Sequence, residues 1–109
     1  MEHNLKYIKV ISMKRKEIED FFKIKDYHSV SLDLDRINVK VKFFKQFCFV
    51  PKVKYAIIVS KKVGNSVLRN FIKRKIREFI IMSLRRYFVN VDLRLCLYFV
   101  FIVRSSLHS

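Results

Sequence analysis

The feature that most constrains the fold of this chain is a long helical pattern between two strands that are apolar on both faces. The helical pattern covers residues 66–87, and the strands are predicted at 55–60 and 93–103. At about 100° per residue, the apolar positions of the helix fall within one arc. These positions are Leu68, Ile72, Ile76 and Phe79. A small sheet with helices packed against it accommodates this strand–helix–strand order.

A third strand is predicted ahead of these elements, at residues 37–43. Apolar and polar side chains alternate there, so one face is expected in the core and the other, with Lys40 and Lys42, at the surface. We expect this strand to continue to Phe49 and to stop at Pro51, because proline cannot donate a ladder hydrogen bond.

The start of the chain is predicted to be partly helical. Residues 13–25 show an apolar stripe at helical spacing, and Ser12 is the expected N-cap. Residues 27–34 are expected to add a short strand, whereas residues 1–12 give little guidance. We therefore predict one α+β domain over residues 1–109, a small α/β sandwich with a mostly antiparallel sheet of about four strands.

The charge of the chain indicates a polyanionic partner. Lys and Arg number 24 against 9 Asp and Glu, a formal net charge of +15. Nucleic acid is the usual partner of so basic a domain, because neutralising phosphates releases counterions. The alternative is a surface tuned only for solubility.

The positive charge is concentrated on the helix at 66–87. Arg69, Lys73 and Arg77 recur every four residues and form a ladder, which we expect opposite the apolar arc together with Asn70 and Arg74. Arginine presents a planar fork that matches phosphate oxygens. A solvated basic face is the alternative interpretation.

Gly64 is the only glycine of the chain and directly precedes this helix. Exposed backbone amides at a helix N-terminus favour an anion, so a direct phosphate contact is one interpretation. The other is a left-handed turn residue followed by a cap. The sequence leaves both open.

Phe21 and Phe22 cannot both face the interior, because adjacent helical residues point about 100° apart. One of them is expected at the edge of an exposed sheet face, where it could stack on an unpaired base.

Neither a catalytic set nor a metal site is predicted. The histidines, and the cysteines Cys48 and Cys96, lack ligand spacing. Asp26, Asp33 and Asp35 could hold magnesium in principle, but a role in loop polarity is favoured. Without a signal peptide pattern or a membrane-length apolar run, we expect a cytoplasmic protein that does not bind membranes.

Residues 59–78 carry a recognisable signature. They read Val-Ser-Lys-Lys-Val-Gly-Asn-Ser-Val-Leu-Arg-Asn-Phe-Ile-Lys-Arg-Lys-Ile-Arg-Glu. This segment resembles the signature of the bacterial ribonuclease P protein component, approximately Ser-Lys-Lys-x-Gly-Asn-Ala-Val-x-Arg-Asn-Arg-x-Lys-Arg-x-x-Arg-Glu. The resemblance implies an α/β sandwich in which the strand–helix–strand crossover is left-handed, against the usual preference.

The resemblance also implies a function in tRNA processing. The family's protein binds a large catalytic RNA and the 5′ leader of precursor tRNA, and the complex is an endonuclease that removes the leader. The RNA carries the chemistry with Mg2+, so the protein needs no metal site of its own. No obligate protein partner is implied. A structural RNA-binding protein, such as a ribosomal component, and a basic domain on a membrane surface are the alternatives.

Site residues are implied position by position. The residues that would contact the catalytic RNA are Lys61, Lys62, Asn65, Arg69, Asn70, Lys73, Arg74 and Arg77. The leader cleft would hold Phe22, Lys40 and Lys42, while Ile18 occupies the position of another aromatic of that cleft and would not stack. Phe71 stands where the family usually has arginine, and it is expected either in the core or facing RNA. The family normally adds a helix after the last strand; this sequence ends at Ser109, so the resemblance implies that the sheet would be less shielded than is usual.

Overall fold

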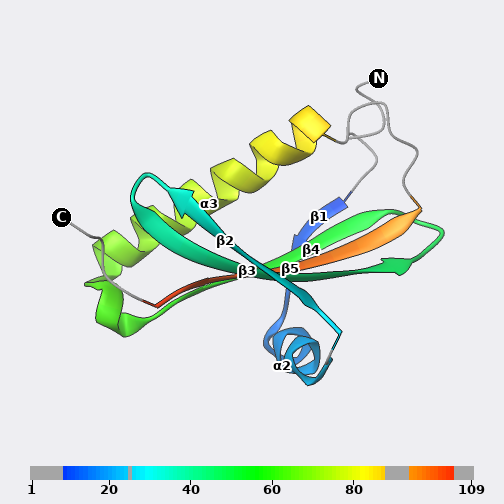
Figure 1. The fold of residues 1–109 in the computed structure, drawn as a ribbon, viewed down its shortest axis with the longest axis horizontal. Coiled ribbons are helices and arrows are strands. Elements are labelled where there is room, and N and C mark those ends of the chain that lie inside the picture. The colour runs from blue at the N-terminus through cyan, green and yellow to red at the C-terminus, as the bar shows by residue number, and fades with distance from the viewer. Residues whose placement is uncertain (1–8, 25, 88–93, 105–109) are drawn as a thin grey trace.

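The computed structural model describes residues 9–24, 26–87 and 94–104. A five-stranded mixed sheet forms its centre. The elements in chain order are β1 (Lys9–Ser12), α2 (Arg15–Lys23), β2 (His28–Leu34), β3 (Ile37–Phe47), β4 (Lys52–Val59), the 3-10 turn η1 (Lys61–Val63), α3 (Ser66–Tyr87) and β5 (Leu95–Val103). The strand order across the sheet is β1-β4-β5-β3-β2 (Figure 1).

The predicted α+β sandwich is confirmed, and the sheet differs from the expectation in two details. It gains a fifth strand, β1, from residues whose pattern predicted no element. Pairings β2–β3 and β3–β5 are antiparallel, whereas β1–β4 and β4–β5 are parallel, so the sheet is mixed. Strand β3 ends at Phe47, two residues before the predicted end, and β2 forms as expected.

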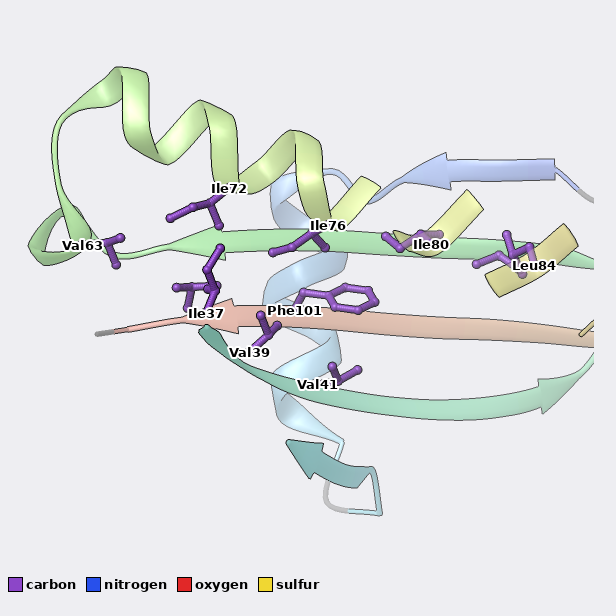
Figure 2. Close-up of a cluster of buried hydrophobic side chains, with 11 residues drawn as sticks. Ile37, Val39, Val41, Val63, Ile72, Ile76, Ile80, Leu84 and Phe101 are labelled. Atoms are coloured by element: carbon purple, nitrogen blue, oxygen red, sulfur yellow. The ribbon is translucent and has the colours of Figure 1, made fainter. Parts of the chain in front are cut away.

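The two helices lie on opposite faces of the sheet (Figure 1). Figure 2 shows Ile72, Ile76, Ile80 and Leu84 of α3 pointing at the sheet, where they meet side chains of β3 and β5. Ile72 and Ile76 are at most 1% exposed. Burying side chains of this size contributes about 1.5–3 kcal/mol each, so this contact sets the position of α3.

Helix α2 covers the other face through a smaller cluster. Phe21 is 3% exposed and packs on Ala56, Val100 and Ile102, and its ring lies 5.4 Å from that of Phe44. The small side chain of Ala56 leaves room for the aromatic ring. The prediction that only one of the two adjacent phenylalanines is buried is confirmed.

A crossover connection joins the two central parallel strands. Strands β4 and β5 are neighbours, and the chain between them passes through η1 and α3. The backbone N–H of Ser60 donates to the carbonyl of Val103 at 2.9 Å, which ties the start of η1 to the end of β5. The left-handed sense of this crossover stays a prediction.

The helix caps differ in part from the expectation. The Oδ1 atom of Asn65 accepts the backbone N–H of Leu68 at 2.9 Å, so Asn65 is the N-cap of α3. Helix α2 begins after Lys14 rather than Ser12, and Glu17 reaches back to accept the Lys14 N–H at 3.0 Å. Lys14 takes the cap position because Ser12 still belongs to β1.

A left-handed conformation at Gly64, one of the two interpretations left open by the sequence, is wrong. Its φ of 160° is extended backbone, which any residue adopts. A Cβ atom at this position would instead lie 2.7 Å from Cδ2 of Leu68. The glycine therefore gives room for a side chain of the first turn of α3, rather than a special backbone angle.

The β2–β3 hairpin is fastened to α3. Its two-residue turn consists of Asp35 and Arg36, whose φ angles are 51° and 70°. Lys75 of α3 donates to Oδ2 of Asp35 at 2.8 Å, and this hydrogen bond lowers the pKa of the carboxyl. The position of Lys75 beside the apolar arc of the helix lets its side chain reach the hairpin.

A second ion pair fastens α2 to the sheet. Glu17 binds the ammonium of Lys54 on β4, and the two side chains are 33% and 21% exposed. The backbone N–H of Lys14, followed by Lys54, lowers the pKa of the Glu17 carboxyl. Both contacts favour the ionised form, so the pair stabilises the position of α2 near neutral pH.

Arg36→Gly is expected to raise the free energy of unfolding by about 1 kcal/mol, because glycine adopts positive φ without the steric cost that a Cβ atom imposes. Equilibrium denaturation measures this change. Arg36→Ala is the matched control, since it removes the same charge and keeps the Cβ atom. An equal gain in both variants would assign the effect to charge instead.

Glu17→Gln is expected to lower stability at pH 7, because it removes the ion pair with Lys54. The loss should be only about 1 kcal/mol, since solvent screens a pair of this exposure. A lowered carboxyl pKa contributes stability above the ordinary pKa and loses it as pH falls. The wild-type chain should therefore lose stability below about pH 5 more steeply than the variant. Glu19→Gln, which opens only the exposed pair with Arg15, serves as control in the same pH series. Parallel curves for all three proteins would contradict the assignment.

Candidate nucleic-acid interface

A line of cations, which we call the basic row, runs along α3 and consists of Arg69, Lys73 and Arg77. Each step of four residues advances a helix by about 400°, so the row drifts by about 40° per step. It begins half-buried at Arg69 and ends exposed at Arg77. The buried stripe recurs at the same spacing and drifts equally, so the row follows one flank of that stripe along the helix.

Arg69 does not lie opposite the apolar arc as predicted. It flanks the buried stripe, and its Nε atom is shielded from solvent without a hydrogen-bond partner. The reason is helical spacing: Arg69, like Lys73 and Arg77, precedes an isoleucine of the stripe by three residues and so lies about 60° from it around the helix. Asn70 and Arg74 are exposed on the outer side, as expected.

Lys73 and Arg77 face the uncovered edge of β4. Strand β1 pairs with β4 only as far as Tyr55, so the edge beyond that residue has no neighbouring strand among the described residues. A hollow of about 270 Å³ lies there, and Ile57 and Ile18 line it together with the two cations. Ile18 lines this hollow rather than the concave surface that Phe22 lines.

The cations of the basic row are free to meet an external anion. In the part of the chain that the structure describes, neither the basic row nor Arg74 forms an ion pair with a carboxylate. Ion pairs involve Arg15, Lys23, Lys54 and Lys75 instead. The acidic residues thus leave the predicted RNA-facing cations unmasked.

The turn before α3 presents further basic groups. Lys61 and Lys62 are both exposed on η1, and the backbone N–H of Lys62 donates to Oγ of Ser60 at 3.2 Å. Asn65 is also exposed, but its side-chain oxygen is engaged in capping α3. Only its amide NH2 group remains to donate to a ligand.

A second concave surface, the α2 cleft, lies where α2 meets the ends of β4 and β5. Its volume is about 510 Å³, and it is lined by Phe22, Ile58, Ser60, Lys62, Ile102, Val103 and Arg104. Phe22 is 41% exposed, in contrast to buried Phe21. An accessible aromatic ring beside two cations is suited to a single-stranded nucleic acid, since rings stack on bases and cations hold phosphates.

Lys42 stands at the aromatic wall of this cleft. Its Nζ atom donates to the Tyr27 hydroxyl at 3.1 Å and lies 5.8 Å from the centre of the Phe22 ring. Lys40 is exposed and pairs in register with Ile102, which lines the cleft. Directly opposite residues share a sheet face, so the structure brings all three predicted cleft residues to one surface.

Arg104 is a cleft residue that the sequence did not single out. It is exposed and follows the last residue of β5, whose carbonyl accepts the Ser60 N–H. That bond brings the end of β5 beside η1, where Lys62 lies. The sequence shows only a cation directly after the end of a strand. That cation can be assigned to a cleft only when the element beside the strand end is known.

Other chemistries have little support in the described ranges. There, His, Cys, Asp and Glu do not gather in groups of three that could hold a metal ion. Cys48 and Cys96 are free thiols. Of the helices described, none is long and apolar enough to cross a membrane.

Comparisons with known proteins find similarity to one family. The model of the protein family described as Ribonuclease P matches residues 13–109. A Ribonuclease P protein component of Mycoplasma capricolum is 49% identical over 49 residues, which cover 38% of this chain and 44% of the relative. Its counterpart in Mycoplasma mycoides is 47% identical over the same shares.

These alignments span less than half the length of each relative, and no solved structure matches the chain. The family match, by contrast, covers all of α2, the sheet beyond β1, and α3. On that match, the chain belongs to the Ribonuclease P family.

Proposed function

We propose that this chain is the protein subunit of ribonuclease P and assists removal of the 5′ leader from precursor tRNA. The observation that carries the proposal is the position of η1. Lys62 on this turn lines the α2 cleft with Phe22, while the same turn leads directly into α3 and its basic row. One short segment therefore joins a cleft for a single strand to a cationic surface.

The two surfaces have different roles in this proposal. Basic and polar groups of α3 and of the turn before it hold phosphates of the catalytic RNA subunit. They are Lys61, Asn65, half-buried Arg69, Asn70, Lys73, Arg74 and Arg77. Phe22 stacks on a leader base, and Lys62, Arg104, Lys42 and Lys40 neutralise the leader backbone. Precursor tRNA is the substrate, and the cytoplasm is the proposed compartment.

The chemistry belongs to the RNA subunit in this proposal. The carboxylate of Asp35 already binds Lys75. The described residues offer no carboxylate cluster of the kind that Mg2+ prefers. Mg2+ is therefore proposed to act with the RNA, where it would supply the activated nucleophile for phosphodiester hydrolysis. The protein contributes binding and positioning. The family match does not favour the alternative of a ribosomal component.

Cleavage of precursor tRNA by the partner RNA at limiting Mg2+ is expected to accelerate when this chain is added, because the added cations raise affinity for both polyanions. Single-turnover cleavage with and without the chain measures the effect. An unchanged rate with a folded sample would remove the proposal. Preferential binding to ribosomal RNA together with an unchanged rate would favour the structural RNA-binding alternative.

Phe22→Ala is expected to weaken binding of leader-containing precursor by about 1–3 kcal/mol and to leave binding of mature tRNA unchanged, because only the precursor supplies a base to stack. Competition binding to the assembled RNA–protein complex measures both affinities. Phe47→Ala is the matched control, since Phe47 is 62% exposed but pairs with Leu95 at the far end of β5. Equal losses for precursor and mature tRNA would assign Phe22 to packing instead.

A further inference from the structure

Two apolar side chains lie among the cations on the outer side of α3. Val67 and Phe71 are one turn apart, and they are 75% and 39% exposed. Both lie away from the buried stripe of Ile72 and Ile76. We call this pair, with Arg74 beside it, the outer step of α3.

Two cations lie close to the Phe71 ring. The Cζ atom of Arg74 lies 5.5 Å from the ring centre, and the Nζ atom of Lys75 lies 5.6 Å from it. Lys75 is in turn fixed by its hydrogen bond to Asp35 at 2.8 Å. The ring is therefore held in place by the scaffold and still keeps a solvent-accessible area, so little side-chain freedom remains to be lost on binding.

The charge around the ring selects the occupant. Asn70 and Arg74 border the outer step on one side, and Lys75 borders it on the other, so an incoming group must tolerate a cationic rim. Glu78, one turn beyond Arg74, bounds the step toward the C-terminus of the helix. An apolar, flat and electron-rich group attached to a phosphate backbone satisfies both the ring and the rim, and an unpaired nucleobase is such a group.

We propose that Phe71 stacks on an unpaired base of the RNA bound by α3, with Val67 supporting the base edge and Arg74 holding the adjacent phosphate. This inference rests on the proposed function, since it requires that α3 faces RNA. It differs from a phosphate contact in its physical signature. Stacking contributes affinity without releasing counterions, so its loss leaves the salt dependence of binding unchanged.

The first test is the affinity of single variants for the ribonuclease P RNA of the same organism over a series of salt concentrations. Phe71→Leu keeps an apolar side chain and removes the ring face, and it is expected to weaken binding about tenfold with an unchanged salt slope. Arg74→Ala is the contrasting variant, expected to reduce the slope by about one unit. Wild-type affinity in Phe71→Leu, or a reduced slope in that variant, would overturn the inference.

The second test does not depend on the stability of Phe71→Leu. The chain contains no tryptophan, so Phe71→Trp introduces a single fluorophore at the outer step. Its emission is expected to be quenched when the ribonuclease P RNA binds, and its affinity to match the wild type. Phe47→Trp is the control and should not be quenched.

Each other outcome has a distinct meaning. RNA binding without quenching at Phe71→Trp would overturn stacking while leaving the proposed function intact. A change of emission with protein concentration alone would identify a second copy of the chain as the occupant and also overturn the inference. A wild-type chain that fails to bind the RNA would contradict the proposed function itself.

Discussion

The packing of α3 against one face of the sheet is the constraint on which the rest of the molecule depends. Ile72, Ile76, Ile80 and Leu84 form a continuous buried stripe over β3 and β5 (Figure 2). Because this stripe fixes the rotation of the helix, it also decides which side chains flank the sheet and which face solvent. A rotation by one residue, about 100°, would remove the isoleucines from the core and bring charged groups into it.

Two acidic residues join separate elements of the scaffold and, among the described residues, leave the basic row unpaired. Glu17 holds α2 to β4, and Asp35 holds the β2–β3 hairpin to α3. Both pairs join elements distant in sequence, and both take a lysine outside the basic row. The chain can therefore carry a net charge of +15 while its basic row stays available to a polyanion.

The turn between β4 and α3 connects the two surfaces that bind in the proposed function. The Ser60 N–H bonded to Val103 brings the ends of β4 and β5 together, and Lys62 and Arg104 consequently border one cleft. Gly64 and Asn65 then begin α3, the first by leaving space for Leu68 and the second by capping the helix. Segments close in sequence thus serve surfaces on opposite sides of the sheet.

The sequence by itself determined the main elements, because apolar periodicity and helix spacing are local properties. It predicted α3 at its observed bounds, the β3 alternation that separates Lys40 and Lys42 from the buried side chains, and the burial of only one of Phe21 and Phe22. The tertiary structure alone decided the place of β1, the membership of Arg104 in the α2 cleft and the half-buried state of Arg69. These depend on which strand edges and helix flanks meet, and residues far apart in the chain set those contacts.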